Sequence, residues 1–152
     1  MFGNVTKIID GLWLGNYQIS QNKNFIKQNN ISVIINCTKD LPFLTGVKEI
    51  KYMYRIPIDD NLQNSEIYEM SKFLTIILPI INSHLNHQKD NILIHCYAGI
   101  QRSAIVVLSY LYKYVDSDIN KCINYMKQKR PIVFTPKMNF KKSIYYSFNK
   151  NI

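Results

Sequence analysis

Residues 95–103 combine a potential nucleophile with groups suited to holding an anion, and they read His-Cys-Tyr-Ala-Gly-Ile-Gln-Arg-Ser. Arg102 follows Cys96 after five intervening residues, and Ser103 comes directly after the arginine. The apolar run 92–94 precedes this segment and a helix-like stretch follows it, so we expect a strand, a tight loop and a helix N-terminus. Inward-pointing N–H groups of such a loop, with the positive end of the helix dipole, form a binding site for phosphate.

Three side chains of this segment have the properties of catalytic groups. Cysteine attacks only as the thiolate, which a helix N-terminus and a nearby arginine favour, so we expect Cys96 to be ionised and nucleophilic. The planar guanidinium of Arg102 matches two oxygens of a phosphoryl group and would stabilise the charge of its transition state. The hydroxyl of Ser103 can donate a hydrogen bond to the sulfur, which would ease its departure when a covalent intermediate hydrolyses.

The remaining residues of the segment are candidates for binding the substrate. We expect His95 to orient the loop through its ring nitrogens, and Gly99 to allow a positive φ or a close approach to the ligand. Backbone N–H groups would contact the phosphoryl oxygens, and they belong to Tyr97, Ala98, Gly99, Ile100, Gln101 and Arg102. A cysteine after a strand is by itself more often a core residue, and an arginine at a helix start a solvated charge. The occurrence of all these residue types together in one segment favours the catalytic interpretation.

Two neighbouring carboxylates, Asp59 and Asp60, are candidates for a general acid. They follow an apolar strand expected at residues 52–56. Displacing a substrate oxygen requires a proton on the leaving group, which an aspartic acid facing the loop would supply. Either residue could instead lie in a turn or cap the helix expected to begin near Ser65.

Segment 95–103 resembles the signature loop of the cysteine-based protein phosphatases. Its sequence Ala-Gly-Ile-x-Arg-Ser is similar to that of the dual-specificity subgroup. Segments 9–15, 34–38, 56–60 and 129–133 resemble that family's opening segment, early core strand, acid loop and the segment before its last helix, so the resemblance covers nearly the whole chain. The family places its acid three residues after the proline of the acid loop. The resemblance therefore favours Asp60 over Asp59.

The resemblance implies a metal-independent phosphatase that acts on phosphotyrosine and phosphoserine/threonine in proteins, without a cofactor. Cys96 would form a cysteinyl-phosphate, while Asp60 would protonate the leaving group and then activate water. The family often carries an asparagine directly after the proline at position 136, whereas this chain has Lys137 there and Asn139 two residues later. Because lysine stands in place of that asparagine, the local hydrogen bond that the asparagine would make is in question.

Two other functions stay open at this point. A net charge of +9 and a pI near 9.4 would attract anionic partners, and some relatives of this loop act on RNA 5′-phosphates or phosphoinositides. The loop itself contains no lysine, which argues against a phosphoinositide, and the basic residues are spread out as on solvated helical faces. A catalytically silent phosphate-binding module is a further alternative, although such modules usually lose the cysteine, the arginine or the acid. Nucleic acid and anionic lipid are accordingly the less favoured partners.

Composition places the chain among intracellular globular proteins. The longest apolar run, 74–81, is too short to span a membrane, and no secretory leader is expected. The three cysteines, Cys37, Cys96 and Cys122, are too few for a disulfide framework or a zinc site. We therefore expect a reducing compartment, the cytoplasm or alternatively the nucleus. A reversible disulfide between Cys96 and either other cysteine is an open alternative.

The expected elements alternate between strands and helices. Strands are expected at residues 5–9, 12–14, 31–36, 52–56 and 92–95. Helices are expected at residues 20–30 with Ser20 as N-cap, 65–87 with a kink at Pro79, 102–114, 118–129 and 136–149. This alternation predicts an α/β protein: a single domain over residues 1–152, with a central, mainly parallel sheet and helices on both faces. The phosphate-binding loop would lie between the central strand and the helix that follows it.

Overall fold

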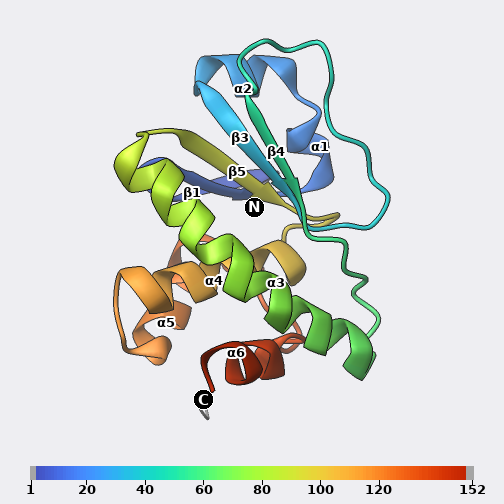
Figure 1. Ribbon diagram of the computed structural model, residues 1–152, viewed down its shortest axis with the longest axis vertical. Helices are drawn as coiled ribbons and strands as arrows, with labels where there is room; N and C mark the ends of the chain where they lie inside the picture. The colour runs from blue at the N-terminus through green and yellow to red at the C-terminus, as the bar shows by residue number, and fades with distance from the viewer. Residues whose placement is uncertain (1–2, 150–152) are drawn as a thin grey trace.

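A five-stranded sheet forms the centre of the computed structural model, which describes residues 3–149 (Figure 1). The strands are β1 (Val5–Ile9), β2 (Leu12–Gly15), β3 (Ile31–Asn36), β4 (Tyr52–Arg55) and β5 (Asn91–His95). Their order across the sheet is β1-β2-β5-β3-β4. Only β1 and β2 pair antiparallel; the other neighbours are parallel. The predicted α/β class and mainly parallel sheet are thereby confirmed.

The central strands β3 and β5 consist mainly of apolar residues, many of them β-branched, as expected for strands covered on both faces. Their parallel register pairs Asn36 with His95, so both strands end at the same edge of the sheet. Crossover connections leave the carboxyl ends of such strands free to hold a ligand. The loop that follows β5 therefore emerges from the most buried part of the sheet.

Helices cover both faces of the sheet, as predicted. The helices are α1 (Tyr17–Ser20), α2 (Lys23–Gln28), α3 (Asn64–Asn82), α4 (Arg102–Tyr114), α5 (Ile119–Lys129) and α6 (Lys141–Phe148). On one face the short α2 packs Ile26 into a small core with Trp13 and Leu93. On the other face α3 and α4 build the main core, and α5 and α6 flank them (Figure 1). Residues 103–111 of α4 are all buried, so this helix is fixed against the sheet that it follows.

Several predicted helix boundaries are wrong. The helix expected over residues 20–30 is two short helices, because the side chains of Asn16 and Asn22 accept hydrogen bonds from N–H groups three residues later and start a helix each. The helix predicted at 65–87 continues through Pro79 and ends at Asn82, where a π-helical segment, η1 (Ser83–His87), follows. The last helix begins at Lys141 rather than at residue 136, since the residues before it form turns.

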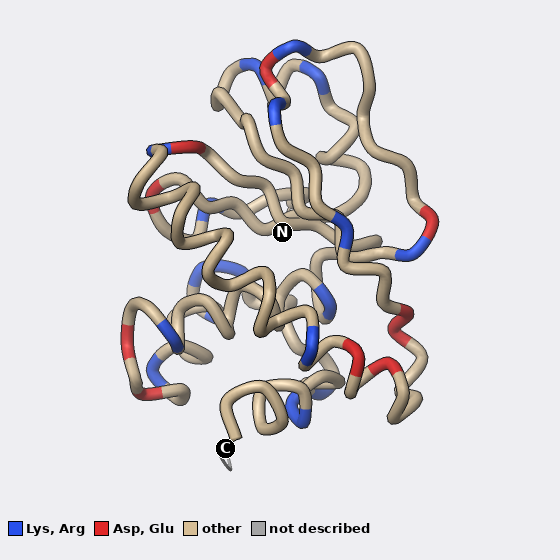
Figure 2. The backbone as a smooth tube through the Cα atoms, in the orientation of Figure 1, with Lys and Arg blue, Asp and Glu red and all other residues tan. Residues whose placement is uncertain are grey.

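Charged residues are spread along the whole backbone rather than gathered in one part of it (Figure 2). Four of the ten acidic residues nevertheless lie in one segment, 59–69, which joins β4 to α3 and forms the start of that helix. None of the helices within residues 3–149 combines the length and apolar character needed to cross a membrane.

Candidate active site

Cys96 directly follows β5, and its side chain is buried at the start of the loop that leads to α4. Its Sγ lies 3.0 Å from the Oγ of Ser103, which is within hydrogen-bond distance. Ser103 is the second residue of α4, so the first turn of the helix that follows the loop lies next to the sulfur. The predicted contact between these two side chains is therefore present in the structure.

Arg102 brings unsatisfied donors to the same place. Its Nη1 donates a hydrogen bond to the carbonyl oxygen of Ile58 at 3.0 Å, whereas its Nε is buried and has no partner among the described residues. The N-terminus of α4 also lacks a side-chain cap. Buried donors without partners are costly, so this cluster of N–H groups fits an anionic oxygen.

His95 holds the chain at the entrance to the loop. Its Nδ1 lies 3.2 Å from the carbonyl oxygen of Cys96. Burial lowers the pKa of His95 from 6.5 to about 4, so the ring is neutral at neutral pH. The nitrogen facing the carbonyl must then carry the proton, which agrees with the predicted orienting role.

Asp60 is tied to the loop through one neighbouring side chain. Its Oδ1 accepts a hydrogen bond from Nδ2 of Asn139 at 3.0 Å, and the backbone N–H of Asn139 donates to Oε1 of Gln101 at 3.0 Å. Asp60 itself is exposed. This chain of two hydrogen bonds places the carboxylate beside the phosphate-binding loop while leaving it accessible to solvent.

Asp59 has different partners, Lys39 and Glu66, neither of which belongs to the phosphate-binding loop. Its carboxylate is 3.1 Å from Nζ of Lys39, and the same ammonium is 2.6 Å from Glu66. The hydrogen bonds to Glu66 and Asp59 raise the pKa of Lys39. The backbone N–H of Asp59 also donates to Oε1 of Glu66 at 3.1 Å. Asp59 thus fixes the segment that carries Asp60, and the geometry favours Asp60 as the acid.

The match to a family model shows to which protein family the chain belongs. The model of the dual specificity phosphatase catalytic domain matches residues 12–150. The chain belongs to this family. The sequence resemblance on which the predictions relied is thereby confirmed.

Individual relatives agree with this membership. Human dual specificity protein phosphatase 16 is 27% identical over 135 residues, which are 89% of this chain and 19% of the relative. A protein of Invertebrate iridescent virus 6, 123R, carries a provisional tyrosine phosphatase name and is 31% identical, with 91% of this chain and 88% of that protein covered. The chain spans about a fifth of the length of the first of these relatives.

A solved structure shows the same fold. The human tyrosine phosphatase-like serine/threonine/tyrosine-interacting protein superposes with a TM-score of 0.80 and covers 96% of both chains at 20% identity. At this level of identity the likeness concerns the fold alone. The chemistry of the phosphatase domain must be argued from its own residues.

The side chain of Gln101 turns away from the phosphate-binding loop of this phosphatase domain. Its Nε2 donates to the carbonyl oxygens of Thr135 at 3.1 Å and Lys137 at 2.7 Å. Gln101 therefore anchors the segment before α6, and only its backbone is left to face a substrate. Two residues after Lys137, Asn139 supplies an amide side chain that reaches Asp60.

The other two cysteines of the phosphatase domain lie in different surroundings. Cys37 is fully buried at the end of β3, and its N–H donates to the carbonyl oxygen of His95. Burial raises the pKa of the Cys37 thiol, and the neighbouring charge of Cys96 raises it further. A reversible disulfide between Cys37 and Cys96 stays an open alternative.

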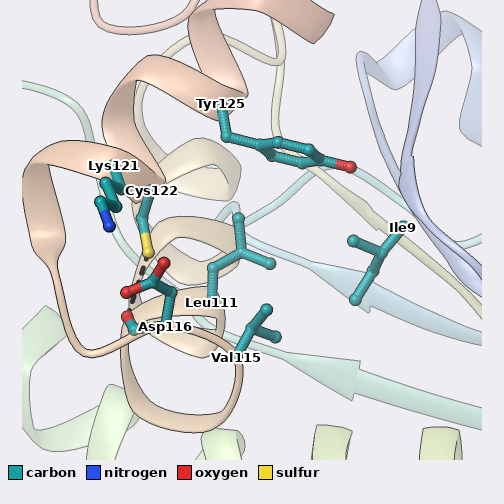
Figure 3. Close-up of a pocket in the computed structure, with 7 residues that line it drawn as sticks. All are labelled: Ile9, Leu111, Val115, Asp116, Lys121, Cys122 and Tyr125. Atoms are coloured by element: carbon teal, nitrogen blue, oxygen red, sulfur yellow. Dashed lines mark hydrogen bonds between the residues drawn. The ribbon is translucent and has the colours of Figure 1, made fainter.

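Cys122 lines a cavity of about 310 Å³ at the C-terminal end of α4, and its Sγ donates to the carbonyl oxygen of Asp116 at 3.3 Å (Figure 3). The cavity is lined by Ile9, Leu111, Val115, Asp116, Lys121, Cys122 and Tyr125. A helix of 13 residues is about 20 Å long, and Cys96 lies at its other end. A disulfide requires Cα atoms within about 7 Å, so Cys122 is no partner for Cys96 in this fold.

Sequence reasoning missed the residues that support this phosphatase site from a distance. Lys39 and Glu66 fix the acid loop, and Arg130 contacts the phosphate-binding loop from behind. The prediction of the site included Arg130 only as part of a segment that resembles the family. No group of three or more His, Cys, Asp or Glu side chains within residues 3–149 is arranged to hold a metal ion.

Proposed function

We propose that this chain is a cysteine-dependent phosphatase that hydrolyses phosphotyrosine and phosphoserine/threonine in proteins. The observation that carries the proposal is the buried sulfur of Cys96, which lies 3.0 Å from the hydroxyl of Ser103. The residue before this serine is Arg102, whose buried Nε has no hydrogen-bond partner among the described residues. A sulfur nucleophile next to unsatisfied cationic donors is suited to attack phosphorus in an anionic ester. Membership of the dual specificity phosphatase catalytic-domain family supports the same reaction.

In the first step the thiolate of Cys96 attacks phosphorus, the phosphorus–oxygen bond to the leaving group breaks, and Asp60 gives that oxygen a proton. Arg102 and the N–H groups of the loop stabilise the charge on the three equatorial oxygens. The hydrogen bond from Asn139 holds the carboxyl group of Asp60 in reach of the site.

In the second step Asp60 takes a proton from a water molecule, the water oxygen attacks phosphorus, and the sulfur–phosphorus bond breaks. The electron pair returns to sulfur, where the hydroxyl of Ser103 stabilises the departing thiolate by hydrogen bonding. Inorganic phosphate leaves and the enzyme is regenerated.

Phosphoproteins are the proposed substrates, in preference to RNA 5′-phosphates or phosphoinositides. The phosphate-binding loop carries no lysine, and the basic residues are scattered along the chain rather than gathered in one place (Figure 2). A silent binding module is disfavoured because cysteine, arginine and acid are all retained. We place the protein in a reducing compartment, the cytoplasm or the nucleus, where a thiolate nucleophile persists.

The test compares phosphate release from four substrates: a phosphotyrosine peptide, a phosphothreonine peptide, a 5′-triphosphate RNA and phosphoinositide vesicles. We expect the protein to turn over both peptides faster than the other two, and the Cys96→Ser variant to turn over none. Preference for RNA or phosphoinositide would overturn the substrate assignment. Residual phosphatase activity in Cys96→Ser would overturn the mechanism.

A further inference from the structure

Four consecutive peptide carbonyls of the phosphate-binding loop each accept a hydrogen bond from a donor outside the loop. In chain order the donors are Tyr17 N to Tyr97 O at 3.0 Å, Arg130 Nη2 to Ala98 O at 3.4 Å, Arg130 Nε to Gly99 O at 3.0 Å and Phe134 N to Ile100 O at 2.9 Å. The carbonyls are thus held toward the surrounding protein. One side chain, Arg130, supplies the donors for two of the four.

The direction of these carbonyls decides the direction of the loop's N–H groups. In a trans peptide the C=O of one residue and the N–H of the next point to opposite sides. Holding the carbonyls of residues 97–100 outward therefore turns the N–H groups of residues 98–101 inward. The N–H groups of Gly99 and Ile100 depend in this way on the guanidinium of Arg130.

Arg130 is itself held in place from the opposite side. Its side chain is 1% exposed, and its Nη1 donates to the carbonyl oxygen of Gly3 at 3.3 Å and to Oγ1 of Thr6 at 3.1 Å. These bonds tie the guanidinium to the β1 segment. Because the side chain is buried and bonded to protein oxygens, a substrate does not reach it.

The loop is also tightly confined next to Arg130. Gly99 has a φ of +70°, and a Cβ atom there would lie 2.7 Å from the carbonyl oxygen of Gly15 and 2.9 Å from Nη2 of Arg130. The backbone therefore fits between the end of β2 and the guanidinium. Without the guanidinium, the two peptides that flank Gly99 would be free to rotate, because glycine tolerates either sign of φ.

The charge of Arg130 acts in the same direction as its hydrogen bonds. Burial lowers the pKa of the Arg130 guanidinium, and the charge of Cys96 raises it. An arginine is effectively always protonated in proteins, so the side chain is positive at neutral pH. A buried positive charge behind the loop favours an anion in front of it.

We propose that Arg130 is a positioning residue for phosphate binding, which holds the carbonyls of Ala98 and Gly99 outward and so directs the N–H groups of Gly99 and Ile100 at the phosphoryl oxygens. It acts through the loop and does not touch the substrate. The inference rests on the proposed function in one respect, namely that the loop binds a phosphoryl group.

The test measures binding of tungstate, a tetrahedral oxyanion that stands in for phosphate, by calorimetry, together with kcat and KM for an aryl phosphate. Arg130→Met removes both donors to the loop, and we expect at least about 10-fold weaker tungstate binding and an about 100-fold lower kcat. Arg130→Lys keeps the charge but offers one compact donor group in place of a fork, so its tungstate affinity should be intermediate.

Thr6→Val is the matched control. It removes one hydrogen bond of the same guanidinium but leaves both bonds to the loop, so tungstate affinity should stay within about twofold while thermal stability falls slightly. Wild-type tungstate affinity in Arg130→Met would overturn the proposal. So would equal losses in Arg130→Met and Thr6→Val, since these would report general destabilisation.

Two further outcomes are decisive. If Arg130→Met fails to fold, wild-type tungstate affinity in Arg130→Lys would overturn the proposal, because charge alone would then suffice, and intermediate affinity would support it. If the unmodified protein binds tungstate but hydrolyses no phosphate ester, the proposed function fails. The role of Arg130 is then judged by tungstate binding alone.

Discussion

The phosphate-binding loop and the acid loop meet at one site, but they are built in opposite ways. The phosphate-binding loop is a contiguous segment between β5 and α4, and the sulfur of Cys96 and the hydroxyl of Ser103 belong to residues only seven positions apart. The acid loop is held by residues far away in the sequence, because Asp60 bonds to Asn139, 79 residues later, and Asp59 bonds to Lys39.

The two regions also differ in burial. Cys96 and Ser103 are buried at the centre of the molecule, whereas Asp60 is exposed and Asp59 is partly exposed. Buried, fully packed groups are fixed, and exposed polar contacts open easily. We therefore expect changes in the phosphate-binding loop to have large effects on oxyanion binding, and changes in the acid loop to act on catalytic rate while sparing that binding.

The largest expected effect comes from Arg102→Lys, which tests the buried region. Lysine keeps the charge but cannot match two phosphoryl oxygens while also bonding to the carbonyl of Ile58, so kcat should fall by about 1,000-fold and tungstate binding should weaken strongly. Steady-state kinetics and calorimetry measure both quantities. A variant with wild-type tungstate affinity would contradict the contrast between the two regions.

The next effect comes from Asp60→Asn, which removes the proton donor of the acid loop. We expect an about 100-fold lower kcat on a phosphothreonine peptide, a smaller loss on p-nitrophenyl phosphate, whose leaving group needs no proton, and unchanged tungstate affinity. Asp59→Asn is the matched control and should lower kcat only a few-fold. A larger loss from Asp59→Asn would reverse the assignment of the acid.

A smaller effect is expected from Lys39→Met, which removes the ammonium shared by Asp59 and Glu66. Because exposed ion pairs contribute little and are screened by salt, kcat should fall only about two- to fivefold, and the difference from the unmodified protein should shrink in 0.5 M salt. Kinetics at low and high ionic strength provide the measurement. A loss as large as that of Asp60→Asn would show that the acid loop is as rigidly coupled as the buried region.

The last expected effect concerns stability rather than rate, and it arises from His95. Its pKa is about 4 in the folded protein and about 6.5 when unfolded, so protonation favours the unfolded chain as pH falls from 6.5 toward 4. Between pH 7.5 and 5.0 the free energy of unfolding should drop by about 2 kcal/mol more in the unmodified protein than in His95→Gln. Urea titrations at the two pH values test this, and equal drops would mean that His95 is not buried as a neutral ring.

The sequence was sufficient to predict β1, β3 and α4, and the roles expected for Cys96 and Arg102, because each depends on neighbours along the chain. A β-branched run becomes a buried strand, and a loop before an apolar helix leaves unpaired N–H groups, wherever such segments occur. Local competition explains the wrong boundaries of the helix expected over residues 20–30, since Asn16 and Asn22 act as the N-caps in place of Ser20.

The sequence by itself predicted the nucleophile and the arginine, and it determined the strand-loop-helix unit that carries them. Only the tertiary structure showed that Asp60 bonds to Asn139 whereas Asp59 pairs with Lys39, and only it placed the guanidinium of Arg130 behind the phosphate-binding loop. The physical reason is the range of the interactions involved. Backbone geometry acts between near neighbours, whereas a hydrogen bond between residues 79 positions apart exists only after packing has brought them together.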